Sequence, residues 1–318
     1  MPSSISSRRV LVVSFLVDIL DVVTNLIVAL LTGSAVVFAE MAQGLADSAG
    51  SALLVIGERR AGRPRDATHP FGYAREAFFW GLLSAVAMLV IGAGLSAWRG
   101  YQQLINPDPL ESPALALAVL ALAVVTNGYA VSLSGRKLAS EAGGLWEAFR
   151  NLNRPLLKGA LLRDAVGTST SVLGLGALVL YQSLGLVLFD AVGALVAASL
   201  MLAASLVLMT QARALITGRA LPEDDLERLR SAVHAIPEVE AVNRLSAIYA
   251  GASEVLVDTD LDLAEGLDTT QIEAVLDDVE ARVRAILPET DRVRILLNSP
   301  ERPAAFTPRR RNGHERGR

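Results

Sequence analysis

The sequence lacks cysteine entirely and has only three histidines. Disulfide frameworks, thiolate metal sites and cysteine nucleophiles are therefore excluded. Charged side chains are scarce and make up 19% of the residues, against about 25% in an average soluble domain. The sequence also lacks clustered basic residues with interleaved aromatics, which would indicate a nucleic-acid partner. This balance is typical of a membrane protein that binds no nucleic acid.

The few charges are unevenly distributed along the chain. Residues 10–210 are poor in charge, whereas residues 220–318 hold dense acidic and basic side chains. This break indicates a membrane half followed by a soluble half. The first apolar stretch is longer than the ~7–15 residues of a signal-peptide core, so we expect it to remain as a membrane segment.

Several apolar stretches reach the ~20 residues that a helix needs to cross the hydrocarbon core. They are Val10–Thr32, Ala35–Ile56, Phe78–Trp98, Pro113–Leu133, Leu156–Leu180 and Leu186–Leu208. The joints at 32–34 and 182–185 are short, so they force the spans that they connect into antiparallel hairpins. The pattern predicts an all-α transmembrane domain of six helices.

The basic residues of the short loops indicate the orientation of these helices. Arginine and lysine gather at 59–65 and 136–158, whereas the opposite loops carry only Arg99. Loops rich in basic residues stay in the cytoplasm. We therefore expect a multi-pass protein of a bacterial inner membrane with both termini in the cytoplasm.

The periodicity of the sequence changes after Leu221. The expected elements are helices at 222–236 and 268–286 and strands at 239–249, 254–263 and 292–298. The order α-β-β-α-β predicts a cytoplasmic α+β domain of the ferredoxin-like type. The expected divisions are a cytoplasmic N-terminus (1–9), a transmembrane domain (10–212), the ferredoxin-like domain (213–300) and a disordered basic tail (301–318).

Polar side chains inside the spans are candidates for function, because a carboxylate in hydrocarbon is costly unless it has a partner or water. Gln43 and Asp47 are four residues apart in the second span and so share a helix face. Asp164 and Thr168 repeat this spacing in the fifth span. Together the pairs can form a four-oxygen metal site. Alternatively, the neutral residues link helices by hydrogen bonds and the aspartates lie near the interface.

A second group of polar residues lies in the first span. Asp18, Asp21 and Asn25 share one face, and with Glu40 of the second span they are candidates for lining a cavity or relaying protons. The alternative for Asp18 is solvation at the cytoplasmic interface. Asp190 begins the sixth span, where we expect a solvated cap of its own helix.

The order of these residues resembles a known family of transporters. Gly33-Ser34, Glu40, Gln43 and Asp47-Ser48, followed by Asp66 and His69-Pro70-Phe71-Gly72-Tyr73, are similar to the cation diffusion facilitator family. The second block is most similar to the branch that includes the ZnT9-type proteins. The resemblance implies a homodimer in the lipid bilayer that moves divalent metal ions, commonly in exchange for protons.

The resemblance also implies a transport site. Its positions are Gln43, Asp47, Asp164 and Thr168, where the family usually has histidine or aspartate in place of Gln43 and a carboxylate in place of Thr168. Oxygen ligands suit Mn²⁺ better than Zn²⁺, so we expect Mn²⁺, then Fe²⁺ or Zn²⁺, as the transported ion. No bound cofactor is expected.

The loop after the second span resembles a further metal site of the family. Asp66 and His69 match it, but Tyr73 stands at the third ligand position. Two ligands fall short of the three or four that zinc usually takes, so a structural role for His69 is the favoured interpretation. His234 is alone in the C-terminal domain, where we expect no metal cluster.

These observations favour a secondary transporter that exports a divalent cation. The alternative is a membrane scaffold or regulator that keeps the fold but has a degenerate metal site. An enzyme is not expected, because no nucleophile–base pair or phosphate-binding glycine loop accompanies the spans.

Overall fold

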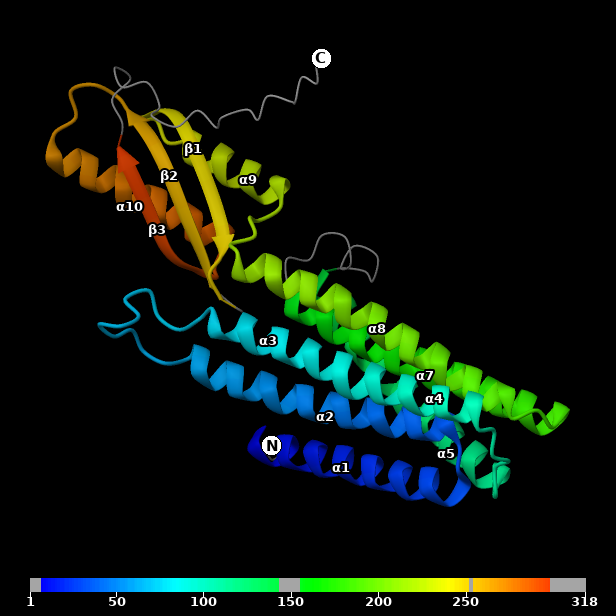
Figure 1. Cartoon of the computed structure of the whole chain (residues 1–318). Coiled ribbons are helices and arrows are strands. Elements are labelled where there is room, and N and C mark those ends of the chain that lie inside the picture. Colours follow the sequence, from blue (N-terminus) through cyan, green and yellow to red (C-terminus); the bar gives the residue numbers. More distant parts are fainter. Residues whose placement is uncertain (1–6, 143–154, 252–253, 298–318) are drawn as a thin grey trace, which may run out of the picture. The chain divides into compact units, whose positions relative to one another are not determined.

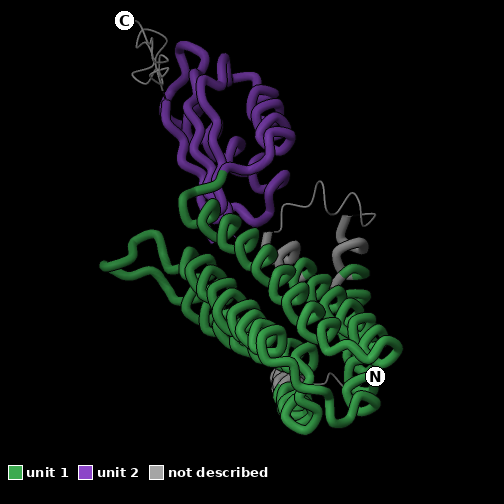
Figure 2. Tube along the Cα trace, turned by 45° about the vertical axis from the view of Figure 1, so that its right-hand side comes forward, with its two compact units in different colours: residues 1–219 green, residues 220–318 purple. Residues whose placement is uncertain are grey.

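The computed structural model describes residues 7–142, 155–251 and 254–297, and the side chains at 7–18, 134, 137–142 and 155–160 lie outside the described part. The chain divides into two compact units, residues 1–219 and 220–318, which Figure 2 shows in green and purple. The expected basic tail lies outside the described residues, as does most of the expected N-terminal segment.

Long helices that run side by side make up the first unit (Figure 1). They are α1 (Ser7–Thr32), α2 (Ala35–Ala61), α3 (Glu76–Ala87), α5 (Pro113–Ala142), α7 (Pro155–Leu184) and α8 (Leu188–Ile216). Within the described residues, four segments are long and apolar enough to cross a membrane: Glu76–Ile105, Pro113–Leu133, Leu161–Leu184 and Leu188–Ile216. The predicted helical membrane domain is confirmed.

Helix α2 is missing from those four segments because it is more polar than the others. It nevertheless lies at the centre of the unit, where it contacts α1, α3, α5, α7 and α8. Its buried residues include Glu40 and Gln43. Polar side chains inside a membrane protein face the bundle interior, so neighbouring helices permit this composition.

The helix that follows the loop between α2 and α3 is longer than the predicted span Phe78–Trp98. It continues from α3 through a π-helical segment, η1 (Met88–Gly94), into α4 (Leu95–Ile105). Gly92 in this segment packs closely on α8, since a Cβ at that position would lie 3.0 Å from the sulfur of Met201. The π segment thus falls where two helices approach each other.

Glycine ends two helices so that the chain can turn back at once. Gly33 and Gly185 both have φ of 69°, a conformation that glycine adopts without steric cost. The Gly33 amide donates to the Ala29 carbonyl at 3.0 Å, and the Gly185 amide to the Tyr181 carbonyl at 2.8 Å. These are left-handed C-terminal caps. They produce the α1–α2 and α7–α8 hairpins predicted from the sequence.

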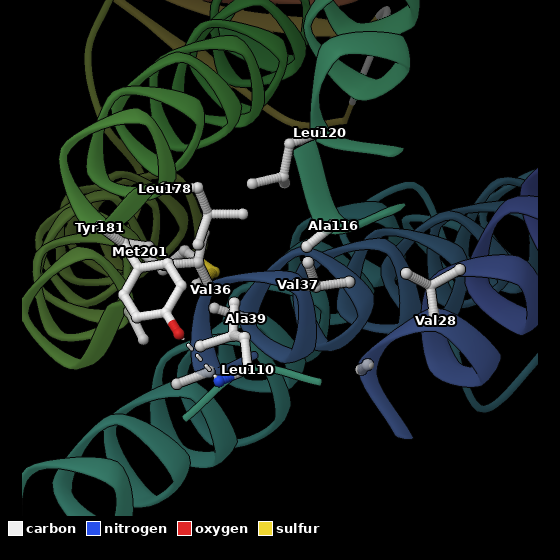
Figure 3. Close-up of a cluster of buried hydrophobic side chains, with 14 of the residues drawn as sticks. Val28, Val36, Val37, Ala39, Leu110, Ala116, Leu120, Leu178, Tyr181 and Met201 are labelled. Carbon is white, nitrogen blue, oxygen red and sulfur yellow. Dashed lines mark hydrogen bonds between the residues drawn. The ribbon is translucent and has the colours of Figure 1, made fainter. Parts of the chain in front are cut away.

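Apolar side chains from α2, α5, α7 and α8 fill the interior of the first unit (Figure 3). The side chain of Val36 packs against Gly174 of α7 and Gly193 of α8. A Cβ at Gly193 would lie 2.7 Å from Cγ2 of Val36. Small residues allow helices to approach closely in this way. The Leu110 amide donates to the Tyr181 hydroxyl at 3.0 Å (Figure 3), which ties the turn before α5 to α7.

The second unit is a small α/β domain. Its elements are α9 (Glu223–His234), β1 (Val239–Tyr249), β2 (Val255–Leu263), α10 (Thr269–Ile286) and β3 (Thr290–Leu297). The sheet order is β1-β2-β3, with β1 antiparallel and β3 parallel to β2. Asp268 and Gln271 form a capping box that starts α10. The predicted order α-β-β-α-β is confirmed.

Candidate functional site

Helices α2 and α7 face each other in an antiparallel register. The Ser171 hydroxyl lies 2.8 Å from one carboxyl oxygen of Glu40. One turn further along α2, a Cβ at Gly167 would lie 2.7 Å from Gln43 Nε2. One turn further again, Arg163 Nε lies 3.6 Å from Asp47 Oδ1. Each turn forward on α2 therefore matches one turn backward on α7.

This register decides where the four predicted ligands lie. Asp164 follows Arg163 directly, so it lies at the level of Asp47. Thr168 follows Gly167 directly, so it lies at the level of Gln43. The two pairs thus lie at corresponding heights along the two helices. Asp164 and Thr168 are each one residue, about 100° of helix rotation, beyond the α7 residues that lie against α2.

The neutral members have further contacts. Gln43 is buried, and the Thr170 hydroxyl donates to its Oε1. The Thr168 hydroxyl donates to the Asp164 carbonyl at 3.0 Å, which leaves the lone pairs of its oxygen for a cation. The sequence interpretation missed Thr170. Its spacing of three from Gly167 is the signal that it shares this face.

Glu40 lies one turn before Gln43 on α2, at the centre of a buried network of hydrogen bonds. The Ser171 hydroxyl lies 2.8 and 3.0 Å from its two carboxyl oxygens, and Asn127 Nδ2 donates to one of them at 2.9 Å. Asn127 also donates to Ser171 at 2.8 Å. The carboxyl group thus links α2 to α5 and α7. These partners offset the cost of burying it.

Asp47 has a cationic neighbour that the sequence interpretation missed. The side chains of Arg163 and Asp47 are 16% and 33% exposed, so their ion pair is largely enclosed. Arg163 NH2 also donates to the hydroxyl of Ser84 on α3 at 2.7 Å. The available signal was the arginine itself, because a charged residue within an apolar span is a functional candidate by default.

The polar face of α1 lies toward α2. Asn25 is buried and donates to the backbone and side-chain oxygens of Asp21 at 3.0 and 3.1 Å. A Cβ at Gly44 of α2 would lie 3.8 Å from Asp21 Oδ2. The side chain of Asp18 lies outside the described part of the chain.

Asp190 does not have the solvated position expected for it. It is fully buried and caps α2 instead of its own helix. Its carboxyl group accepts hydrogen bonds from the Ser34 hydroxyl at 2.6 Å, the Ala35 amide at 2.7 Å and the Val36 amide at 3.2 Å. The first turn of a helix has unpaired N–H groups and a partial positive charge, which attract this carboxylate from α8.

The loop between α2 and α3 is organised around Asp66. Its Oδ1 accepts from the Thr68 and His69 amides at 2.9 and 2.7 Å, and its Oδ2 accepts from the Tyr73 hydroxyl at 2.7 Å. Hydrogen bonds from Thr68, Tyr73 and His69 hold the pKa of Asp66 below its usual range. The His69 ring lies 4.0 Å from the Tyr73 ring. These contacts favour the structural interpretation of Asp66 and His69.

Among the residues that the structure describes, no three or more His, Cys, Asp or Glu side chains gather closely enough to hold a metal ion. The four predicted ligands include two carboxylates, Asp47 and Asp164, so a metal ion bound there would also need the neutral oxygens of Gln43 and Thr168. Such a set suits a hard cation that also keeps water molecules.

Two family models together cover most of the chain. Residues 11–216 match the cation efflux transmembrane domain, and residues 221–296 match the cytoplasmic domain of cation efflux proteins. The chain belongs to the cation efflux family. The predicted membership of the cation diffusion facilitators, as this family is also called, is confirmed.

Individual members of the cation efflux family are similar over long stretches. The mitochondrial proton-coupled zinc antiporter SLC30A9 of Xenopus laevis is 30% identical over 259 residues, which is 80% of this chain and 46% of the antiporter. The cation-efflux pump FieF of Cronobacter sakazakii is 24% identical over 286 residues, 89% of this chain and 88% of the pump. The chain thus spans about half the length of the antiporter, at 46%.

Proposed function

We propose that this chain is a secondary transporter that exports a divalent metal cation in exchange for protons. The observation that supports this proposal is the antiparallel register of α2 and α7, in which Asp47 lies beside Arg163, the residue before Asp164, and Gln43 lies beside Gly167, the residue before Thr168. Family membership supports the proposal, as does the presence of a proton-coupled zinc antiporter and a cation-efflux pump among its relatives.

The four residues have different roles in this proposal. Asp47 and Asp164 bind the cation as anionic ligands, and Gln43 Oε1 and Thr168 Oγ1 add neutral oxygens. Carboxylate and carbonyl ligands favour Mn²⁺, whereas imidazole, which is missing from these positions, suits Zn²⁺. The substrate candidates are therefore Mn²⁺, Fe²⁺ and the Zn²⁺ carried by the antiporter relative.

Proton exchange follows from the chemistry of the ligands. Carboxylates bind a metal ion only when they are deprotonated, so protonation of Asp47 and Asp164 on the far side of the membrane releases the cation. Glu40 lies one turn before Gln43 on α2, and Asp21 of α1 lies beside Gly44 of α2. They extend a polar path along the helices through which protons reach the site.

The proposal includes an arrangement in the membrane. Both termini and the second unit lie in the cytoplasm of a bacterial cell, and two copies of the chain form a homodimer. The cytoplasmic-domain match of residues 221–296 supports the location of the second unit. Alternating access then rocks helices around the fixed α2–α7 site.

Metal flux into proteoliposomes tests the proposal. Replacing one anionic ligand resembles breaking a buried ion pair, which costs about 3–5 kcal/mol, or about two to four decades in affinity. Asp47→Asn and Asp164→Asn should each abolish Mn²⁺, Fe²⁺ and Zn²⁺ flux. Gln43→Ala and Thr168→Ala remove a neutral ligand worth about 1 kcal/mol and should only weaken it.

The exposed Asp108 provides a matched control for the loss of one carboxylate. Asp108→Asn should transport like the parent chain. If both Asp47→Asn and Asp164→Asn also transport like the parent, the two carboxylates are structural and the proposed site is wrong. If the parent moves none of the three ions, the chain is not a transporter of these metals.

A further inference from the structure

The guanidinium group of Arg163 lies between helices α2, α3 and α7 and contacts side chains of the first two. From α7 it reaches Asp47 on α2, with 3.6 Å between Nε and Oδ1. Its NH2 donates to the hydroxyl of Ser84 on α3 at 2.7 Å. Ser84 is itself 1% exposed, so a buried hydroxyl holds the far end of the arginine.

Gly50 keeps space open beside this group. A Cβ at Gly50 would lie 2.6 Å from Ser84 Oγ and 3.6 Å from Arg163 NH1. Any larger residue at Gly50 would therefore displace the serine that holds the guanidinium. The local packing of α2, α3 and α7 thus accommodates a cation next to the Asp47 carboxylate.

This position creates a competition for Asp47. Arginine keeps its positive charge at every accessible pH, and it lies against a carboxylate that the transported ion also needs. A divalent cation on Asp47 meets a fixed positive charge in a partly desolvated site, where charges interact more strongly than in water. The Asp47 carboxylate therefore cannot pair closely with the Arg163 guanidinium and with the divalent cation at the same time.

We propose that Arg163 is a tethered competitor of the transported ion, an inference that rests on the proposed function. Arg163 occupies Asp47 when the metal site is empty, and the arriving divalent cation displaces it. The arginine neutralises one of the two site carboxylates in the empty state. It thereby sets the affinity for the ion low enough for release.

Metal binding to the full-length chain in detergent tests the inference, with Mn²⁺ as the probe in isothermal titration. Arg163→Ala removes the competitor and should tighten Mn²⁺ binding about tenfold, within the usual range of coupling between two ligands. Arg163→Lys keeps the charge but loses the guanidinium hydrogen bond to Ser84, so it should bind Mn²⁺ about threefold more tightly than the parent and less tightly than Arg163→Ala. Free guanidinium chloride at low millimolar concentration should weaken Mn²⁺ binding to Arg163→Ala more than sodium chloride does.

Ser84→Ala supplies a second test if Arg163→Ala does not fold. It releases the far end of the arginine without altering its charge, and it should tighten Mn²⁺ binding about threefold, equivalent to roughly one hydrogen bond. Unchanged or weaker binding in the folded variants, with no effect of guanidinium, would overturn the inference.

The two proposals fail in different ways. If the parent binds Mn²⁺, Asp47→Asn abolishes binding and Arg163→Ala leaves it unchanged, only the competitor role is wrong. If Asp47→Asn binds Mn²⁺ as the parent does, the proposed site is wrong and the competitor role falls with it.

Discussion

The cap that Asp190 provides for α2 leads to a quantitative prediction. In the parent protein the backbone N–H of Ala35 donates to Oδ2 of Asp190. Asp190→Asn replaces this oxygen by an NH₂ group, which cannot accept the hydrogen bond, and keeps the other oxygen as an acceptor. One buried donor is left unpaired, which costs about 1–3 kcal/mol. The lost negative charge at the N-terminus of α2 adds about 1 kcal/mol. We expect a total destabilisation of about 3 kcal/mol, within the sum of these two contributions.

The apparent melting temperature of the protein in detergent measures this effect. A loss of 3 kcal/mol in a unit of this size corresponds to about 6–12 °C. The control is Asp108→Asn, which removes an exposed carboxylate from the turn before α5 and should melt within about a degree of the parent, because surface changes have small effects. If Asp190→Asn melts like this control, the contacts of Asp190 do not stabilise α2 and the reasoning is wrong.

Three further predictions concern Glu40, the Asp66 loop and the topology. Ser171→Ala removes the hydroxyl that donates to Glu40 and should cost about 1–3 kcal/mol, seen as a melting temperature several degrees lower. Ser169→Ala removes an exposed hydroxyl that donates to the Ala165 carbonyl of its own helix, and this control should melt like the parent. The pKa of Asp66 is lower in the folded loop than in an unfolded chain, so its stabilising contribution is full above the unfolded pKa and is lost as the pH falls through the folded value. The protection of the amides in residues 66–73, measured as the exchange rate relative to the intrinsic rate at each pH, should therefore stay constant down to about pH 4 and fall below it, while Asp66→Asn should show low protection already at neutral pH; equal protection in both would contradict this. Because the chain has no cysteine, Arg63→Cys can be labelled selectively, and we expect labelling only from the cytoplasmic side; labelling from outside would reverse the proposed orientation.

Periodicity and glycine positions allowed much of the fold to be predicted from the sequence. Apolar stretches of sufficient length marked the helices of the first unit, and the short joints at Gly33 and Gly185 predicted its hairpins. In the second unit, the alternation around Val257 and the cap at Asp268 marked β2 and α10. These signals are local, because each depends on a single continuous segment of the sequence.

Contacts between distant residues could not be predicted in the same way. Asp190 was expected to cap its own helix because it stands at the start of that helix in the sequence. Its actual partner, Ser34, is 156 residues away. The Thr170–Gln43 hydrogen bond likewise spans 127 residues. Four-residue spacing within α2 and within α7 indicated which residues share a face, but only the packing of the two helices sets their register.

Equilibrium binding of Mn²⁺ to the purified chain tests most directly whether Asp47 and Asp164 hold the same ion. Two ligands of one ion act as a unit, so their substitutions should be strongly non-additive. We expect Asp47→Asn and Asp164→Asn each to eliminate the same saturable site, and the double variant to lose no more than either alone. Saturable Mn²⁺ binding by the double variant with the affinity of the parent would contradict the account.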